Sequence, residues 1–256
     1  MKVIILAGGY GTRLSEETEI LPKPMIEIGG KPLLWHLMKI FSSQGLNHFV
    51  VALGYKGEVI KRYFLHYPQM QSDLHIDLSA GVVRQDKPFS ENWRIDLVET
   101  GRDTMTGGRL KRLARYIDDT IIFTYGDGLS NIDVKRLLAF HRSHGKLATV
   151  SAVRPVSRFG ILDIDENKMV RTFSEKPVDR QDLINGGFFV LEPGALDYID
   201  DDSSTWEGEP CRRLARDHQM AAYCHDGYWQ CVDTLHELRL LRETWNSGSA
   251  PWKIWD

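Results

Sequence analysis

Short apolar runs alternate with apolar stripes of helical spacing along the first part of the chain. A run bounded by glycine or polar residues is typical of a buried strand, and apolar residues that recur every three or four positions are typical of a helix facing a core. The predicted strands are residues 3–6, 49–53, 120–125 and 147–153. The predicted helices are residues 33–41, 59–64 and 134–140. This alternation predicts an α/β fold with a Rossmann-like, doubly wound and mostly parallel sheet.

Two later segments depart from this regular alternation. Residues 74–78 and 94–98 alternate as strands do, and the polar segment 79–92 between them is predicted to be a loop or an excursion from the sheet. Residues 158–163 and 169–173 are joined by a polar turn, which predicts a small β excursion.

The C-terminal part, from Ser203 onward, is predicted to be mostly helical, with a candidate strand at residues 220–224. Thr234 and Glu237 have the spacing of a capping box, so we expect a helix to begin there. Trp252 and Trp255 in the tail have no apolar stripe around them, and we expect them to dock on the domain or on a neighbouring subunit.

A glycine-rich segment follows the first predicted strand. It contains Gly8, Gly9 and Gly11, and Arg13 comes shortly afterwards. Consecutive backbone N–H groups in such a loop form a concave site for anions, and the arginine fork suits phosphate oxygens. Lys23 lies between two prolines, which restrict the backbone on both sides of it. Since ligands of doubly wound sheets bind at the carboxyl ends of the strands, these residues predict a polyphosphate site.

Two common phosphate-binding motifs do not fit this loop. The dinucleotide fingerprint G-x-G-x-x-G requires a third glycine where this chain has Leu14, and the P-loop requires a lysine that does not follow Gly11. An NAD-dependent oxidoreductase is therefore disfavoured, although the first half of its fingerprint is present.

Two carboxylates are candidates for a metal site. Asp127 lies between Gly126 and Gly128 directly after a predicted strand, and Asp233 lies at the start of the predicted C-terminal helix. Mg²⁺ prefers oxygen ligands and shares them with substrate phosphates. The alternatives are an ordinary Asp-Gly turn at Asp127 and an acid that only stabilises a helix start at Asp233.

Composition narrows the class of protein. The net charge is −3 over 256 residues, which does not suggest a nucleic-acid-binding protein. The three cysteines lack metal-site spacing and favour reduced thiols in the cytoplasm, and no apolar run approaches the ~20 residues of a membrane span. His36, His141 and His144 lack acidic partners at metal spacing and are interpreted as packing or surface residues.

The glycine segment, L-A-G-G-Y-G-T-R-L at residues 6–14, and P-K-P at residues 22–24 together resemble the signature of the sugar-1-phosphate nucleotidyltransferases. Three further segments resemble the branch of this family that uses CTP and glucose 1-phosphate, namely residues 105–112, 123–128 and 250–253. The resemblance implies one nucleotidyltransferase domain over residues 1–256, of nucleotide-diphospho-sugar transferase type. Its nucleotide part would be about residues 1–150 and its sugar-phosphate part about residues 151–256.

The resemblance also implies a reaction and a cofactor. CTP and α-D-glucose 1-phosphate would give CDP-glucose and pyrophosphate with Mg²⁺, in nucleotide-sugar biosynthesis of the O-antigen type. We expect small-molecule substrates, no nucleic acid or membrane partner, and a homo-oligomer in the cytoplasm. Another nucleotide or sugar, or a non-catalytic nucleotide-sugar-binding protein, remains an alternative.

Site residues follow from the same resemblance. The implied catalytic residues are Arg13, Lys23 and Asp127, and the implied metal ligands are Asp127 and Asp233. The implied nucleotide-binding residues are Leu6, Ala7, Gly8, Gly9, Tyr10, Gly11, Thr12, Arg13, Lys23, Thr104, Arg109 and Gly126. The implied sugar-phosphate-binding residues are Glu175, Lys176, Asn185 and Gly186, although Glu175 and Lys176 on composition alone also fit a solvated surface pair.

Overall fold

A computed structural model of the chain describes residues 1–11, 21–86, 91–155, 161–174 and 183–255. In this part of the chain the strands are β1 (Lys2–Leu6), β2 (Glu27–Ile28), β3 (Lys31–Pro32), β4 (His48–Leu53), β5 (Leu74–Asp77), β6 (Val82–Gln85), β7 (Arg94–Glu99), β8 (Ile121–Tyr125), β9 (Gly128–Ser130), β10 (Ala148–Val153), β11 (Ile161–Ile164), β12 (Val170–Ser174), β13 (Ile184–Leu191), β14 (Met220–His225) and β15 (Trp229–Cys231). The α-helices are α2 (Leu33–Ser42), α3 (Gly57–Met70), α4 (Thr106–Arg112), α5 (Val134–His144), α6 (Glu209–Arg216) and α7 (Leu235–Asn246). Short 3₁₀ helices are η2 (Lys23–Met25), η3 (Ala114–Tyr116) and η4 (Pro193–Tyr198).

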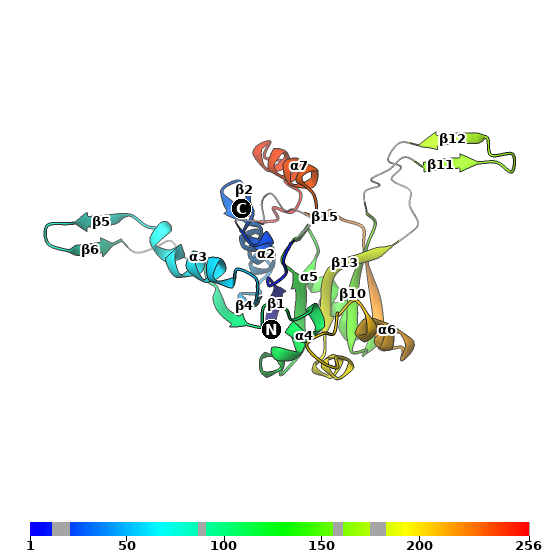
Figure 1. Cartoon of the computed structure of the whole chain (residues 1–256), viewed down its shortest axis with the longest axis horizontal. Helices are drawn as coiled ribbons and strands as arrows, with labels where there is room; N and C mark the ends of the chain where they lie inside the picture. Colours follow the sequence, from blue (N-terminus) through cyan, green and yellow to red (C-terminus); the bar gives the residue numbers. More distant parts are fainter. Residues whose placement is uncertain (12–20, 87–90, 156–160, 175–182, 256) are drawn as a thin grey trace.

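A seven-stranded sheet forms the centre of the molecule (Figure 1). Its order is β14-β10-β13-β8-β1-β4-β7, and neighbouring strands are parallel except where β13 pairs with β10 and β8. The prediction of a mostly parallel, doubly wound sheet is therefore confirmed. The sheet takes strands from both predicted parts of the chain, and the division near residue 150 stays a prediction.

Side chains of β1, an interior strand of the sheet, enter two separate hydrophobic cores. Val3 and Ile5 pack in one core with α2, α5 and α7, while Ile4 and Leu6 pack in the other with α4 and α6. Successive side chains of a strand point to opposite faces of a sheet, so a strand covered on both faces must be apolar throughout. This explains why β1 reads as a continuous apolar run.

Two hairpins lie away from the body of the molecule, β5–β6 on one side and β11–β12 on the other (Figure 1). The second is the small β excursion predicted from the sequence. The expectation of a loop or an excursion over residues 79–92 is correct only in part, because Val82–Gln85 forms a strand paired with β5. In the C-terminal part, β14 is the strand predicted at residues 220–224, and β15 is a further strand that was not predicted.

The C-terminal tail packs into one of the two cores. Trp252 is completely buried and stacks on Tyr228 and Trp245. Its indole N–H donates to Nδ1 of His36 at 3.5 Å, and burial lowers the pKa of His36 to about 4, which keeps that ring neutral. The interpretation of His36 as a packing residue is thus confirmed, and Trp252 docks on its own domain.

Replacing Trp252 by alanine is expected to lower the free energy of unfolding by about 3–5 kcal/mol, because a large buried ring leaves a cavity. Denaturant titration measures the change. Lys253→Ala is the matched control, because the neighbouring side chain is exposed. A loss below about 1 kcal/mol for Trp252→Ala would contradict the docking described here.

The described part of the chain contains no helix with both the length and the apolar character needed to span a bilayer.

Candidate active site

A cleft of about 1590 Å³ opens at the carboxyl ends of β1 and β8. Single small-molecule sites typically measure ~300–1,000 Å³, so the cleft has room for two substrates. All of the sequence-predicted site residues that the structure describes line it, namely Leu6, Ala7, Gly8, Gly9, Tyr10, Gly11, Lys23, Thr104, Arg109, Gly126, Asp127, Asn185, Gly186 and Asp233.

Four predicted site residues lie outside the described residues: Thr12, Arg13, Glu175 and Lys176. The implied roles of Arg13 at the nucleotide phosphates and of Glu175 and Lys176 at the sugar phosphate stay predictions.

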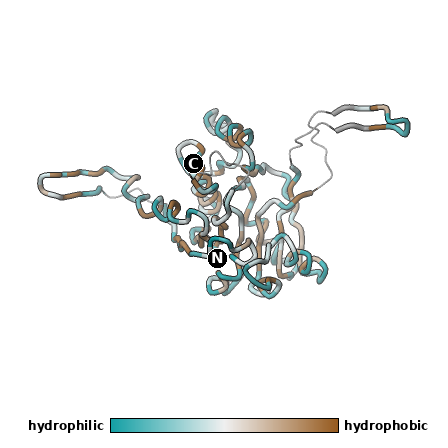
Figure 2. Tube along the Cα trace, viewed as in Figure 1, coloured by the Kyte–Doolittle hydropathy of each residue, from teal (hydrophilic) through white to brown (hydrophobic). Residues whose placement is uncertain are grey.

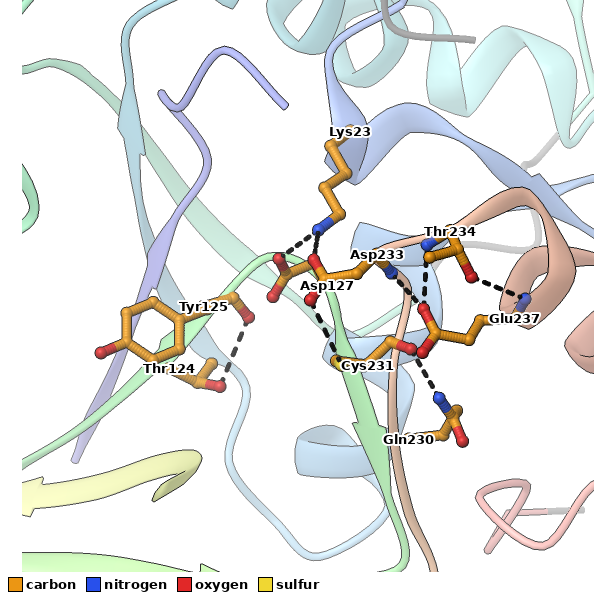
Figure 3. Close-up of polar contacts among 9 residues, drawn as sticks. All are labelled: Lys23, Thr124, Tyr125, Asp127, Gln230, Cys231, Asp233, Thr234 and Glu237. Carbon is orange, nitrogen blue, oxygen red and sulfur yellow. Dashed lines mark hydrogen bonds and ion pairs between the residues drawn. The ribbon is translucent and has the colours of Figure 1, made fainter. Parts of the chain in front are cut away.

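The ammonium group of Lys23 lies between two carboxylates (Figure 3). Its Nζ donates to Oδ2 of Asp127 and to Oδ1 of Asp233, both at 2.7 Å. Burial by itself would lower the pKa of Lys23, but the charges and hydrogen bonds of the two acids outweigh it and raise the pKa above its ordinary value. Lys23 is therefore a fixed cation inside the cleft.

The two acids are more than a hundred residues apart in sequence, and the pairing of two short strands brings them together. Strand β9 directly follows Asp127, and β15 ends two residues before Asp233. The strands pair antiparallel with Gly128 opposite Cys231, and the N–H of Val232 donates to the carbonyl of Asp127 at 3.0 Å. Backbone pairing thus fixes the distance between the carboxylates.

Asp233 is held in place by the start of α7. The carboxylate of Glu237 accepts from the backbone N–H of Asp233 at 2.7 Å and of Thr234 at 2.9 Å, and the hydroxyl of Thr234 accepts from the N–H of Glu237. This is the capping box predicted from the sequence, now confirmed. Rigid support of this kind places the Asp233 side chain accurately at the cleft.

Asp127 and Asp233 are suitable ligands for a divalent cation that prefers oxygen atoms. Both carboxylates converge on one point, now taken by the Lys23 ammonium, and both are partly open to the cleft. Among the residues that the structure describes, no group of three or more acids, histidines or cysteines could hold a metal by itself. Two carboxylates that leave other positions for substrate phosphates and water are the usual arrangement for Mg²⁺.

Cys231 beside this centre is a neutral thiol. Burial and the negative charge of Asp233 raise its pKa to about 12, and its Sγ lies 3.7 Å from Oδ2 of Asp233. A thiol is a poor nucleophile compared with a thiolate. The centre therefore suits charge stabilisation rather than covalent catalysis.

Arg109 holds the backbone around the glycine loop. Its guanidinium donates to the carbonyls of Gly8, Leu53, Gly101 and Arg102 and to the hydroxyl of Thr100.

Small residues make room for this arginine. A Cβ at Gly8 or Gly54 would overlap the guanidinium, so the arginine and the loop fit only because both positions are glycine. In this structure Arg109 lies behind the loop, and its predicted contact with nucleotide stays a prediction.

The glycine loop is also tied to the segment before α4. The hydroxyl of Tyr10 donates to the carboxylate of Asp103, and the Tyr10 ring packs against Tyr55. Thr104 is buried at the edge of the cleft. The loop after β1 and the loop after β7 therefore form one wall of the cleft.

The cleft lining also contains residues that the sequence did not identify as site residues, among them Tyr125, Thr106 and Glu207. The hydroxyl of Thr106 donates a hydrogen bond to Oε2 of Glu207 at 2.7 Å. Tyr125 and Thr106 lie in two of the segments that resemble the family, residues 123–128 and 105–112, but Glu207 belongs to no recognisable motif. The only local signal for Glu207 is its position after the buried Trp206 and just before α6.

Comparisons with known proteins agree with this geometry. A family model described as "Nucleotidyl transferase" matches residues 2–242. Over 258 residues, covering both chains completely, the chain is 49% identical to the glucose-1-phosphate cytidylyltransferase of Salmonella typhi. It is 46% identical to the probable glucose-1-phosphate cytidylyltransferase of Bacillus subtilis strain 168, with the same coverage. HddC from Yersinia pseudotuberculosis has a similar structure, with a TM-score of 0.69 at 25% identity over 95% of this chain and 99% of that chain.

Proposed function

Because the chain belongs to the nucleotidyl transferase family, we propose that it transfers the cytidylyl group of CTP to α-D-glucose 1-phosphate and releases pyrophosphate. Full-length similarity to the Salmonella typhi enzyme supports the choice of both substrates. The product, CDP-glucose, would serve nucleotide-sugar biosynthesis of the O-antigen type.

The observation that carries the proposal is the Asp127–Lys23–Asp233 centre inside a cleft large enough for two substrates. Two polyanions must approach each other in this reaction, so a site has to neutralise charge and align the reacting groups. A lysine and two carboxylates beside an anion-binding glycine loop supply these functions without a covalent intermediate.

In the proposed mechanism, a phosphate oxygen of the sugar phosphate attacks the α-phosphorus of CTP. The bond from that phosphorus to the bridging oxygen of the β-phosphate breaks, and its electron pair leaves with pyrophosphate. Lys23 would turn from the two acids to the α-phosphate and stabilise the charge that develops there. Backbone N–H groups of residues 8–11 would bind the nucleotide phosphates, with Arg13 at the leaving group.

We propose Mg²⁺ as the cofactor, held by Asp127 and Asp233. When bound, it would neutralise phosphate charge and polarise the phosphoryl oxygens. The two carboxylates lie on separately supported loops, one after β8 and one before α7, so the chain can hold them in position before substrates arrive.

Pyrophosphate release tests the proposal directly. Each of the four nucleoside triphosphates is combined with glucose 1-phosphate, galactose 1-phosphate and mannose 1-phosphate in the presence of Mg²⁺. We expect CTP with glucose 1-phosphate to give the highest kcat/KM. Preference for another pair would replace the substrates but keep the reaction class, and binding of CTP without turnover for any pair would indicate a nucleotide-sugar-binding protein.

We further propose that the chain works as a homo-oligomer in the cytoplasm. All residues of both strands of the β5–β6 hairpin are exposed, and the hairpin carries apolar side chains (Figure 2). A lone two-stranded hairpin is marginally stable in water, so a second copy of the chain is a suitable cover. The three cysteines are unpaired, as is usual in a reducing compartment.

Changing Ile76 and Leu78 together to serine is expected to lower the molar mass measured by light scattering after size-exclusion chromatography. Both side chains are more than half exposed on the hairpin, and serine removes the apolar surface that a second copy would cover. Arg84→Ser on the same hairpin should leave the mass unchanged. A monomeric wild-type protein, or an unchanged mass in the double variant, would contradict an interface at this hairpin.

A further inference from the structure

A second polar cluster occupies the part of the cleft over β8 and β13. It consists of Glu207, Tyr125 and Asn185, which all line the cleft. The mechanism above assigns no task to Glu207 or Tyr125. These residues are far apart in sequence but share one cavity. The chemistry of their side chains therefore indicates what kind of ligand the cavity can bind.

Glu207 is held firmly although its side chain is open to the cleft. The hydroxyl of Thr106, at the start of α4, donates to Oε2 of Glu207 and accepts from the N–H of Trp206 at 2.8 Å. The Trp206 side chain is completely buried against Phe123 and Phe189. The Glu207 carboxylate is bonded to Thr106, and the preceding residue is anchored by its N–H and its buried ring, so Glu207 has less freedom than an ordinary surface residue.

Tyr125 supplies the second observation. Its hydroxyl oxygen is buried and makes no hydrogen bond of normal geometry to any residue that the structure describes. Burial and then the negative charge of Glu207 raise the pKa of Tyr125 above its ordinary value, so the hydroxyl keeps its proton. The ring points away from Lys23 and the two aspartates (Figure 3). The hydroxyl also interacts with Glu207 and Asn185, so the three side chains form one polar group that a ligand with hydroxyl groups can complete.

The charge of Glu207 limits what this cluster can bind. A carboxylate only accepts hydrogen bonds and repels phosphate, so its partner must be a neutral group with O–H or N–H donors. Glu207 does not join Asp127 and Asp233 in a metal-binding group of described residues. Sugar hydroxyls, which both donate and accept, satisfy Glu207, the Tyr125 hydroxyl and the Asn185 amide together.

The order of strands separates Tyr125 and Asn185 from the nucleotide wall, whereas Glu207 is bonded to Thr106 at the start of α4 and lies between the two ends of the cleft. The glycine loop after β1 is bonded to the end of β4, where the Ala7 and Tyr55 amides donate to the carbonyls of Ala52 and Gly8. Tyr125 and Asn185 belong to β8 and β13, on the other side of β1. The cleft thus has one end for the nucleotide and another for the second substrate.

We infer that Glu207 is a specificity-determining residue that accepts hydrogen bonds from hydroxyl groups of the hexose ring, beside Tyr125 and Asn185. The inference rests on the proposed function, because it takes the second substrate to be a sugar 1-phosphate. A site built to bond substrate hydroxyls rejects analogues that lack or misplace them, since its own buried polar groups are then left unpaired.

Comparing the affinities of CDP-glucose and CDP isolates the contribution of the sugar without any turnover. For Glu207→Ala we expect calorimetry to show an affinity for CDP-glucose that is about 10–100-fold weaker, which corresponds to the loss of a charged hydrogen bond. The affinity for CDP should change by less than about twofold. Glu207→Gln keeps one acceptor oxygen, so its affinity for CDP-glucose should lie between those of the wild type and of Glu207→Ala. Glu209→Gln, two residues further along and outside the cleft lining, should match the wild type.

The kinetic companion is the panel of sugar 1-phosphates. Glu207→Ala should raise KM for the preferred sugar phosphate and reduce discrimination against its epimers, while KM for CTP stays the same. Unchanged CDP binding also serves as the test of correct folding.

Two outcomes would overturn the inference. Equal weakening of CDP and CDP-glucose would place Glu207 at the nucleotide, for example at the amino group of cytosine. Unchanged affinity for both would show that it contacts neither. If the proposed function names the wrong sugar, the wild-type protein itself will bind CDP-glucose weakly. The same comparison is then made with the preferred sugar nucleotide and the matching nucleoside diphosphate.

Discussion

Replacing Lys23 by methionine is expected to lower kcat by about 10²–10³-fold, the range for loss of one positioned donor to a developing charge. The ammonium lies in the cleft between Asp127 and Asp233, where its pKa is raised, so it is charged at every pH at which the protein is folded and active. Methionine is an unbranched side chain one atom shorter than lysine, so it keeps most of the apolar stem and removes the charge and the donors. Steady-state pyrophosphate release measures the change.

The control for this variant is Lys31→Met, which removes a lysine of the same N-terminal region outside the cleft. Thermal unfolding of both variants checks that they fold. If Lys23→Met released pyrophosphate at a rate within about threefold of the wild type, Lys23 would not stabilise the transition state.

Replacing Asp127 by asparagine is expected to reduce kcat by a similar ~10²–10³-fold or more, because the amide keeps the shape of the side chain but loses the charge that would hold Mg²⁺. Asp233→Asn should act in the same direction. Chelation of divalent cations should abolish wild-type turnover, and added Mg²⁺ should restore it.

Binding separates the metal role from general damage to the cleft. We expect Asp127→Asn to lose the effect of Mg²⁺ on CTP affinity while it still binds CTP, measured by calorimetry with and without Mg²⁺. Asp118→Asn, whose carboxylate pairs with Lys2 outside the cleft, is the matched control. An Asp127→Asn variant with normal Mg²⁺ dependence would rule out this aspartate as a metal ligand.

The sequence predicts best where a function is encoded by neighbouring residues. The strand β1, the glycines after it and Lys23 lie within a short stretch, so their types and spacing can be read directly. The capping box at Thr234 is equally local. These segments required no knowledge of pairing between distant parts of the chain, and the structure places them at one cleft as expected from strand order.

Features that depend on long-range pairing could not be read in the same way. Strands β9 and β15 have only three residues each, and their pairing explains why Asp127 and Asp233 meet. Glu207 and Tyr125 are far apart in sequence, and an acid after a tryptophan has no distinctive pattern. The spacing of apolar residues within one element does not indicate which residues from distant parts of the chain will come together.

The tail shows the same limit for packing. The sequence of the tail predicts that its tryptophans dock, but not on which surface, and Trp252 is completely buried in its own domain. Its partners, Tyr228, Trp245 and His36, come from three other elements. Each of them is unremarkable in its own segment.

The fit of Arg109 between Gly8 and Gly54 has a consequence for how relatives of this chain can diverge. A side chain at either glycine would collide with the guanidinium, while loss of the arginine would leave several loop carbonyls without donors. A Cβ at Gly8 would also lie 2.9 Å from the backbone N of Gly54, and one at Gly54 would lie 2.8 Å from the carbonyl oxygen of Gly8, so loss of the arginine alone would not make room for a side chain. We expect a library randomised at all three sites to keep glycine at both loop positions in its active clones, whichever residue replaces the arginine.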